Sequence, residues 1–309
     1  MPPTMAPQLV LVSRGRESQR HSFEQVARLV ELESPGVRAR VICDRPHRRR
    51  RLLLALHPTL VVSPVPLVRF QPLRGAVAQG VRRDKSWELE RLDAAGVPLP
   101  RWTLLRGPGD PVPRDFGPYV VAKPNHGFRG HLVRIVRSNR VSWKPKHEAH
   151  EGLLVQEFVY TGPWPRSYRV STLFGEVLYA CVSEASHARR ALASRWGFSS
   201  GEQGGGLSLV ATARDATVTL TDDPEVLALA RRAAKAFPEI PLLAVDVVRD
   251  VETGRCFVLE VNPRGRTWYF ATRRGRALQA SNGIDFAAQF DGLRIAARTL
   301  AAETRRRAR

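Results

Sequence analysis

The chain of 309 residues has few cysteines and no long uninterrupted apolar run. Its three cysteines, Cys43, Cys181 and Cys256, lie far apart and form no Cys-x-x-Cys pair. This spacing excludes a disulfide framework and a cysteine-based zinc site, so we expect small buried hydrophobic side chains. The most apolar stretch, residues 52–68, is interrupted by His57 and three prolines. It therefore falls short of the roughly 20 apolar residues that cross a bilayer, and we expect no membrane contact.

The sequence also lacks a basic segment followed by a long apolar core at its start, so it predicts no secretory signal and a cytoplasmic protein. Lysine and arginine total 49 against 29 acidic residues, a formal net charge of +20. Only five of the basic residues are lysines, which shows a strong arginine bias. A charge of this size attracts phosphates and nucleic acid. Arginine bias on solvated surfaces explains the same charge without a function, and both interpretations stay open.

Residues 1–80 are predicted to form a small parallel α/β domain, because short apolar runs alternate with amphipathic segments. The predicted strands are residues 8–13, 37–42 and 59–63, and the predicted helices begin at Ser22, in capping-box form, and at Arg48. Residues 64–83 contain prolines and glycines with little periodicity. We place the domain boundary there, which leaves residues 81–309 as a second, larger domain.

The second domain is predicted to be rich in strands. Helices are expected over residues 84–95, capped by Asp84, over 224–237 and over 285–304. Strands are expected over residues 119–125, 131–138, 153–159, 167–174, 176–183, 242–248 and 256–262.

The last predicted strand pair carries an acidic constellation. Glu260 and Asn262 are two residues apart, so they project from one face of a strand. If the turn centres on residues 252–254, antiparallel pairing places Asp246 opposite residue 259 or 260. Two carboxylates in apolar surroundings repel each other unless a cation lies between them, and oxygen ligands of this kind suit Mg2+. The alternative is a solvent-facing acidic pair on an edge hairpin.

Two further segments suit a nucleotide. Lys123 lies in an apolar strand, where an unpaired ammonium is costly, and Gly127 and Gly130 follow in a loop that permits close approach to phosphate. Residues 156–159 (Gln-Glu-Phe-Val) offer backbone groups to an adenine edge, with Phe158 as an apolar wall. An edge-strand lysine, a hairpin turn and a buried strand end are the ordinary structural alternatives.

Taken in order, these residues resemble the ATP-grasp superfamily from about Arg83 to Ala288. The resemblance rests on Asp84 and Lys85 before a helix, Gly96 to Pro100 after it, Lys123 with Gly127 and Gly130, Gln156 to Val159, Arg169 in Ser-Tyr-Arg-Val, and the Asp246, Glu260, Asn262 set. The branch of ribosomal-protein glutamyl ligases and glutathione synthetases is the most similar. Its Gln-Glu-Phe-Val and Glu-Val-Asn segments are alike, and residues 282–286 resemble the start of its C-terminal helix.

The resemblance implies an α/β (α+β) class, with an ATP-grasp fold in which two sheets enclose ATP, preceded by the small parallel α/β domain. It implies a carboxylate-amine ligase that depends on ATP and Mg2+, with Mn2+ as an alternative metal. Such enzymes form an acyl phosphate and release ADP and phosphate. The implied partners are a small acid plus an amine, or a peptide or protein substrate.

The resemblance also implies roles for individual residues. It places Lys85, Lys123, Gly127, Gly130, Glu157, Phe158 and Val159 at the nucleotide, Asp246, Glu260 and Asn262 at the metal, and Arg169 and Arg195 at the transferred phosphoryl group. Arg195 is equally explained as a solvated surface charge. Ser167 departs from the pattern, because an acidic residue often precedes the Ser-Tyr-Arg-Val arginine by two positions.

A basic and aromatic segment follows Asn262. We expect Arg264 or Arg266 to pair with an acidic substrate. Trp268 and Tyr269 either wall the substrate site or pack ordinarily in the core.

A nucleic-acid-binding protein that uses the nucleotide-binding fold as a scaffold is the alternative from another class. The basic segments at residues 143–146 and 305–309 would serve such binding. The chain contains no recognised nucleic-acid motif, and the Asp, Glu and Asn set is intact. The sequence therefore favours the ligase.

Overall fold

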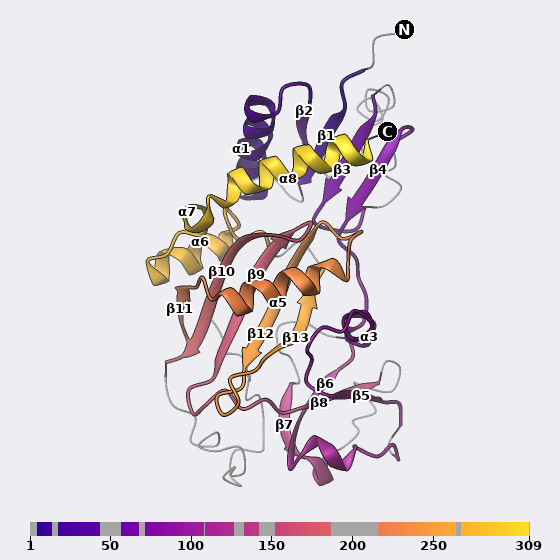
Figure 1. Ribbon diagram of the computed structural model, residues 1–309, viewed down its shortest axis with the longest axis vertical. Coiled ribbons are helices and arrows are strands. Elements are labelled where there is room, and N and C mark those ends of the chain that lie inside the picture. The colour runs from indigo at the N-terminus through magenta and orange to yellow at the C-terminus, as the bar shows by residue number, and fades with distance from the viewer. Residues whose placement is uncertain are drawn as a thin grey trace.

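The structure is a computed structural model, and it describes most of the chain. The described residues are 5–13, 18–43, 57–67, 72–107, 109–126, 133–141, 152–186, 216–263 and 267–308. They form three sheets (Figure 1), with a four-stranded sheet at one end of the molecule, a five-stranded sheet in the middle and a second four-stranded sheet at the other end. None of the helices described is long and apolar enough to cross a membrane.

The first sheet is parallel, with strand order β2-β1-β3-β4. Its elements are β1 (Gln8–Ser13), α1 (Ser18–Glu33), β2 (Arg38–Cys43), β3 (Thr59–Ser63) and β4 (Gly75–Gln79). The three predicted strands are confirmed, whereas β4 was missed because it lies in the segment without periodicity. The predicted capping box is wrong: α1 begins at Ser18, and Ser22 lies inside it, donating to the carbonyl of Gln19. The helix predicted from Arg48 lies outside the described residues.

The second sheet is antiparallel, with strand order β5-β8-β6-β7. It follows α3 (Lys85–Ala94) and consists of β5 (Trp102–Leu105), β6 (Tyr119–Pro124), β7 (Arg134–Arg137) and β8 (Leu153–Glu157), with short 3-10 turns at Arg114–Phe116 and Ser138–Arg140. Asp84 precedes α3 as predicted, but its side chain makes no capping hydrogen bond. It contacts His126 Nδ1 at 2.8 Å instead.

The third sheet is also antiparallel, with strand order β11-β10-β9-β12-β13. Its strands are β9 (Arg166–Leu173), β10 (Glu176–Ala185), β11 (Ala216–Leu220), β12 (Leu242–Arg249) and β13 (Cys256–Asn262). Helix α5 (Pro224–Lys235) covers one face of it (Figure 1) and buries Val226, Leu227, Leu229, Ala230, Ala233 and Ala234 there. The opposite face of the third sheet carries Arg169 and Asp246, together with Leu173, Tyr179 and Cys181, which belong to the core shared with the first sheet.

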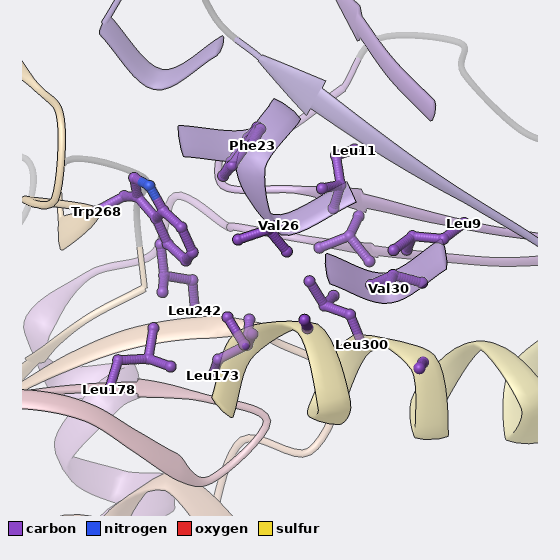
Figure 2. Packing of buried hydrophobic residues seen from close by; sticks show 14 of the residues in the cluster. Leu9, Leu11, Phe23, Val26, Val30, Leu173, Leu178, Leu242, Trp268 and Leu300 are labelled. Carbon is purple, nitrogen blue, oxygen red and sulfur yellow. The ribbon is translucent and has the colours of Figure 1, made fainter. Parts of the chain in front are cut away.

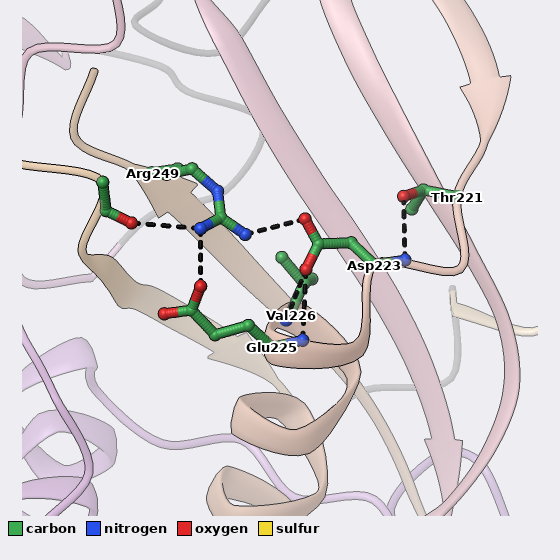
Figure 3. Close-up of polar contacts among 6 residues, drawn as sticks. Thr221, Asp223, Glu225, Val226 and Arg249 are labelled. Carbon is green, nitrogen blue, oxygen red and sulfur yellow. Dashed lines mark hydrogen bonds and ion pairs between the residues drawn. The ribbon is translucent and has the colours of Figure 1, made fainter.

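The start of α5 is held by a polar cluster (Figure 3). Asp223 caps the helix by accepting from the backbone amides of Glu225 and Val226 at 3.1 and 3.2 Å. Its second oxygen accepts from Arg249 on β12 at 2.7 Å, and Arg249 also donates to the Glu225 carboxylate. The cluster confirms the predicted helix start and ties it to the end of β12.

The C-terminal residues form α6 (Arg273–Asn282), α7 (Phe286–Phe290) and α8 (Gly292–Arg307). A single helix was predicted over residues 285–304, but Asp291 adopts a left-handed conformation (φ 55°) and separates α7 from α8. Helix α8 runs back along α1 and the first sheet (Figure 1).

A continuous hydrophobic core joins the first and third sheets (Figure 2). Leu300 of α8 lies between Val26 and Val30 of α1 on one side and Leu173 of β9 on the other. Trp268, which follows β13, belongs to the same core. The first sheet ends at Gln79, close to the predicted domain boundary at residue 80. This boundary stays a proposal, because residues on both sides of it share one core.

Candidate active site

The second and third sheets approach each other at Lys123 and Glu260. Lys123 is only 5% exposed, and its Nζ lies 3.9 Å from Glu260 Oε2. On the same face of the second sheet lies an apolar cluster formed by Tyr119, Val121, Ile135, Phe158 and Tyr160. The second sheet therefore presents an apolar face that ends in one buried cation, which points to an acidic group of the third sheet.

Three adjacent strands of the third sheet bring the polar residues together. Asp246 of β12 is paired directly with Glu260 of β13 and, on its other side, with Arg169 of β9. The first pairing is one of the two registers predicted from the sequence, which placed Asp246 opposite residue 259 or 260. Asn262, two residues beyond Glu260, donates from Nδ2 to Asp246 Oδ2 at 3.0 Å.

A β-bulge in β13 determines which way Glu260 points. Asp246 pairs with Glu260 but the next residue, Val247, pairs with Val258, so Leu259 is an extra residue. In a regular strand Val258 and Glu260 would share a face, and Glu260 would enter the core beneath α5 with Val258. The extra residue sends Val258 and Val261 into that core and leaves Glu260 on the polar face. Bulges re-aim side chains in this way next to active sites.

The Asp246 carboxylate is fully engaged by its neighbours. Arg169 donates from Nε to Oδ1 at 2.7 Å and from Nη2 to Oδ2 at 2.8 Å, a bidentate pair. Burial raises the pKa of Asp246 in spite of Arg169, whereas the Asp246 charge raises the pKa of Arg169 well above its ordinary value. The third nitrogen of Arg169, Nη1, donates to the Tyr269 hydroxyl at 3.4 Å.

The two lysines surround Glu260 with positive charge. Burial favours the neutral form of Glu260, but the charges of Lys123 and Lys85 outweigh it and lower the pKa of this carboxyl. Burial likewise lowers the pKa of Lys123, and the Glu260 charge opposes that shift. Glu260 is therefore an ionised, partly exposed carboxylate, with 32% of its side chain in contact with solvent.

Sequence reasoning missed two residues that build this part of the site. Asn125, directly after β6, accepts from the backbone amides of Lys85 at its carbonyl (3.1 Å) and Ser86 at Oδ1 (2.9 Å), which fixes the start of α3 beside Lys123. Glu88 is 6% exposed, and its charge acts on Lys123. The sequence signal that could have identified Glu88 is its position three residues after Lys85, on the same face of the helix.

The predicted adenine segment lies at the end of β8. The Glu157 carboxylate forms a bidentate pair with Arg101, Nε and Nη2 each 3.0 Å away, and the Glu157 amide donates to the Arg101 carbonyl. Phe158 is buried in the apolar cluster of the second sheet. The assignment of Glu157, Phe158 and Val159 to a nucleotide stays a prediction.

Five of the predicted site residues lie outside the described residues: Gly127, Gly130, Arg195, Arg264 and Arg266. For Trp268, the structure decides between the two predicted roles, a wall of the substrate site or ordinary core packing. It is 2% exposed, it packs edge-on against Phe23 of α1, and its Nε1 donates to Ser22 Oγ at 2.7 Å. Trp268 is therefore a core residue, whereas Tyr269 reaches the site through Arg169.

The oxygen donors suit a hard divalent cation that brings further ligands of its own. Among the described residues there is no cluster of three or more His, Cys, Asp or Glu side chains. The site instead supplies Asp246, Glu260 and the Asn262 amide, beside three positively charged side chains. Mg2+ is typically bound by one or two carboxylates together with water and nucleotide phosphates, so these residues fit it.

Part of the basic C-terminal tail, which the nucleic-acid alternative would use, is held by an ion pair within α8. Arg306 and Arg307 both pair with Glu303, at 2.6 and 2.5 Å. The single carboxylate of Glu303 offsets one of these positive charges. The basic segment at residues 143–146 lies outside the described residues.

Solved structures that match this one over nearly the whole chain identify the fold. D-cycloserine synthetase DcsG has a TM-score of 0.53 at 19% sequence identity, over 96% of this chain and 99% of that chain. The ATP-grasp ligase PsnB, complexed with a phosphomimetic variant of a minimal precursor, Mg and ADP, has a TM-score of 0.54 at 16% identity, over 97% and 99%. The chain has the ATP-grasp fold.

A third structure with this fold is a RiPP-associated ATP-grasp ligase from Chryseobacterium gregarium, in complex with ADP and a leader and core peptide. Its TM-score is 0.52 at 11% identity, over 96% of this chain and 97% of that one. No protein-family model matches the sequence, and no curated protein matches it. The predicted ATP-grasp fold is confirmed, while the likeness at these identities is one of fold.

Proposed function

We propose that this protein is an ATP- and Mg2+-dependent carboxylate-amine ligase. The observation that carries the proposal is the meeting of Lys123 from the second sheet with Asp246, Glu260, Asn262 and Arg169 from the third. Cations and acidic oxygen ligands placed side by side suit a nucleotide whose phosphates need both charge neutralisation and a metal.

The residues of the site have separate roles in this proposal. Lys85 and Lys123 neutralise nucleotide phosphates, and the apolar face around Phe158 and Tyr119 accepts the base. Asp246, Glu260 and Asn262 hold Mg2+, which when bound neutralises phosphate charge. Arg169 stabilises the phosphoryl group during transfer, since a planar guanidinium matches phosphate oxygens with paired hydrogen bonds.

The reaction consists of two displacements. A substrate carboxylate oxygen attacks the γ-phosphorus of ATP, and the bond between this phosphorus and its bridging oxygen breaks, which releases ADP. The acyl phosphate formed is then attacked at its carbonyl carbon by an amine nitrogen. Phosphate leaves with the bonding electrons, the amine loses a proton, and an amide results. The chain contributes positioning and charge, without a covalent bond to the substrate.

Structures with the same fold support two substrate classes. DcsG is a synthetase of the small molecule D-cycloserine, and PsnB is complexed with a precursor peptide in another structure. We therefore propose a small acid plus an amine, or a peptide or protein, as the substrate pair. Arg264 and Arg266 remain our proposed contacts for an acidic substrate.

The test is ADP formation in a screen of amino acids, peptides and small acids with hydroxylamine present. An acyl phosphate would be trapped as a hydroxamate, and both products should require Mg2+. Asp246→Asn and Glu260→Gln should abolish ADP formation, and Arg169→Gln should reduce hydroxamate more than ATP binding.

The matched control is Arg166→Gln, since Arg166 lies on the same strand as Arg169 but pairs with Glu184 at its exposed end. This variant should behave as the wild type. AMP as the product, or full ADP formation by Asp246→Asn, would refute the proposed chemistry or the metal assignment respectively.

A further inference from the structure

The position of Arg169 conflicts with two roles proposed above, its own role at the phosphoryl group and the role of Asp246 as a metal ligand. Its Nε and Nη2 contact the two carboxylate oxygens of Asp246 at 2.7 and 2.8 Å, and its Nη1 contacts the Tyr269 hydroxyl at 3.4 Å. All three guanidinium nitrogens are therefore engaged. Asp246 is one of the three metal ligands of the proposed function, and both of its oxygens already face a cation.

A metal ion and this arginine compete for Asp246, because Oδ1 already accepts from Arg169 and Oδ2 accepts from Arg169 and Asn262. Two cations a few ångström apart repel each other, and the repulsion is strong where water is scarce, as it is around the 10%-exposed side chain of Asp246. In this position every guanidinium nitrogen of Arg169 is in a hydrogen bond, and only one N–H on each of Nη1 and Nη2 stays available to a phosphoryl group. A metal ion that takes both oxygens of Asp246 therefore displaces Arg169 from them.

The geometry indicates which cation moves. A buried carboxylate left without a partner is costly, so the metal-free protein needs a counter-ion at Asp246. Lys123 pairs with Glu260 at 3.9 Å, while Arg169 lies on the neighbouring strand directly opposite Asp246 and donates to both of its oxygens. About 30% of the Arg169 side chain is exposed, so one side of it is open toward solvent.

We propose that Arg169 is an exchangeable counter-ion: it holds Asp246 in the metal-free protein and is released toward the phosphoryl group when metal and nucleotide bind. The inference rests on the proposed function and adds to it an order of events at the site. Metal binding and the arrival of Arg169 at the reacting phosphate become coupled, since the two cations compete for the same carboxylate. Tyr269 keeps Arg169 oriented during this exchange, because its hydroxyl accepts from Nη1, the guanidinium nitrogen that does not contact Asp246.

The exchange has a measurable consequence for metal affinity. In the absence of nucleotide the metal must displace Arg169, so the wild type should bind it weakly. Replacing Arg169 by an uncharged residue removes the competitor. We expect Arg169→Gln to bind Mn2+, the probe metal, roughly tenfold more tightly than the wild type without nucleotide, a coupling of ordinary size.

The experiment measures free Mn2+ by electron paramagnetic resonance at mildly alkaline pH, with and without a non-hydrolysable ATP analogue. The variants are Arg169→Gln, Arg169→Lys, Asp246→Asn and the matched control Arg166→Gln. Arg166→Gln should bind Mn2+ as the wild type does, which excludes a general effect of net charge. Arg169→Lys preserves the charge without the bidentate geometry and should give an intermediate affinity, so it carries the test if Arg169→Gln fails to fold.

A second readout follows the arginine itself. The Nε–H resonance of Arg169, assigned by its loss in Arg169→Lys, should shift when Mg2+ and the ATP analogue are added together, and should not shift in Asp246→Asn. An Arg169→Gln affinity equal to or weaker than that of the wild type, or an unmoved resonance in protein that binds the metal, would overturn the exchange. Failure of the wild type to bind Mn2+ even with the analogue would instead overturn the proposed function.

Discussion

Lys123 shows how one residue links the apolar and polar parts of this site. It continues the apolar face of β6, yet its ammonium group lies beside Glu260, and burial lowers its pKa. The charges of the carboxylates around it, above all Glu260, oppose this shift and favour the ammonium form. The arrangement is expected to bind an additional anion, such as a nucleotide phosphate, when a metal occupies the carboxylates.

Replacing this lysine tests its assignment to the nucleotide. We expect Lys123→Met, which preserves the methylene volume, to weaken ATP binding by about 10- to 100-fold, the value of one charge-assisted hydrogen bond of roughly 1.5–3 kcal/mol. Lys235→Met is the control, because Lys235 is exposed on α5. Calorimetric titration with the ATP analogue and Mg2+ measures both. Equal ATP affinities of the two variants would mean that Lys123 has a structural role and does not bind the nucleotide.

Cys181 is the second residue with a specific consequence. It lies on β10 opposite Arg169, is 3% exposed, and burial raises the pKa of its thiol to about 12 from an ordinary value of 9.0. The folded protein then holds the thiol proton more tightly than the unfolded chain does. The stability that this proton contributes is complete below about pH 9 and is lost as the pH rises toward about 12.

We therefore expect the free energy of unfolding of the wild type to fall between these pH values more steeply than that of Cys181→Ala. Urea unfolding at a series of pH values, followed by circular dichroism, gives both curves. Parallel curves would mean that the thiol does not titrate differently in the two states.

At the scale of elements, α5 depends on one aspartate for its start and for its attachment to the third sheet. Asp223 caps the helix and also accepts from Arg249 of β12 (Figure 3). The helix covers the face of the third sheet opposite the site residues, so its packing holds the strands that carry Asp246 and Arg169.

Removing this cap should destabilise the protein. We expect Asp223→Ala to lower the free energy of unfolding by about 1–2 kcal/mol, the usual cost of a lost aspartate cap. Asp222→Ala is the matched control, since Asp222 is the preceding residue and is exposed. Denaturant unfolding of the two variants makes the comparison. A loss of equal size in both would mean that helix-terminal charge, and not the cap, is responsible.

At the scale of the whole molecule, the segment after β13 links the candidate site to the first sheet. Trp268 lies six residues beyond Asn262 and packs against Phe23 of α1, while Tyr269 next to it reaches Arg169. The core shared by the first and third sheets (Figure 2) is completed by α8. We infer that the two parts of the chain unfold together.

Trp268→Ala tests this coupling. Because the side chain is fully buried, we expect a loss of about 3–5 kcal/mol, and hydrogen exchange should show β1, β9 and β12 losing protection together. Trp164→Ala is the control, since Trp164 is 47% exposed. Loss of protection confined to the first sheet would show two independent units and would support the boundary at residue 80.

The sequence by itself determined most strands and the helix starts at Lys85 and Pro224, and it placed Asp246 opposite residue 259 or 260. These features depend on local periodicity and on a short hairpin, where few registers compete. It also pointed to Lys123, because a charged residue in an apolar strand is a local anomaly.

Only the tertiary structure decided the rest of the site. The bulge at Leu259, the engagement of Asp246 by Arg169 and the burial of Trp268 against Phe23 join residues far apart in the chain or depend on the register of several strands. Likewise β4, β5, β11 and α6 are too short or too polar to show a clear period, so the neighbours they pack against decide their conformation. Packing, unlike periodicity, is a property of the assembled sheets.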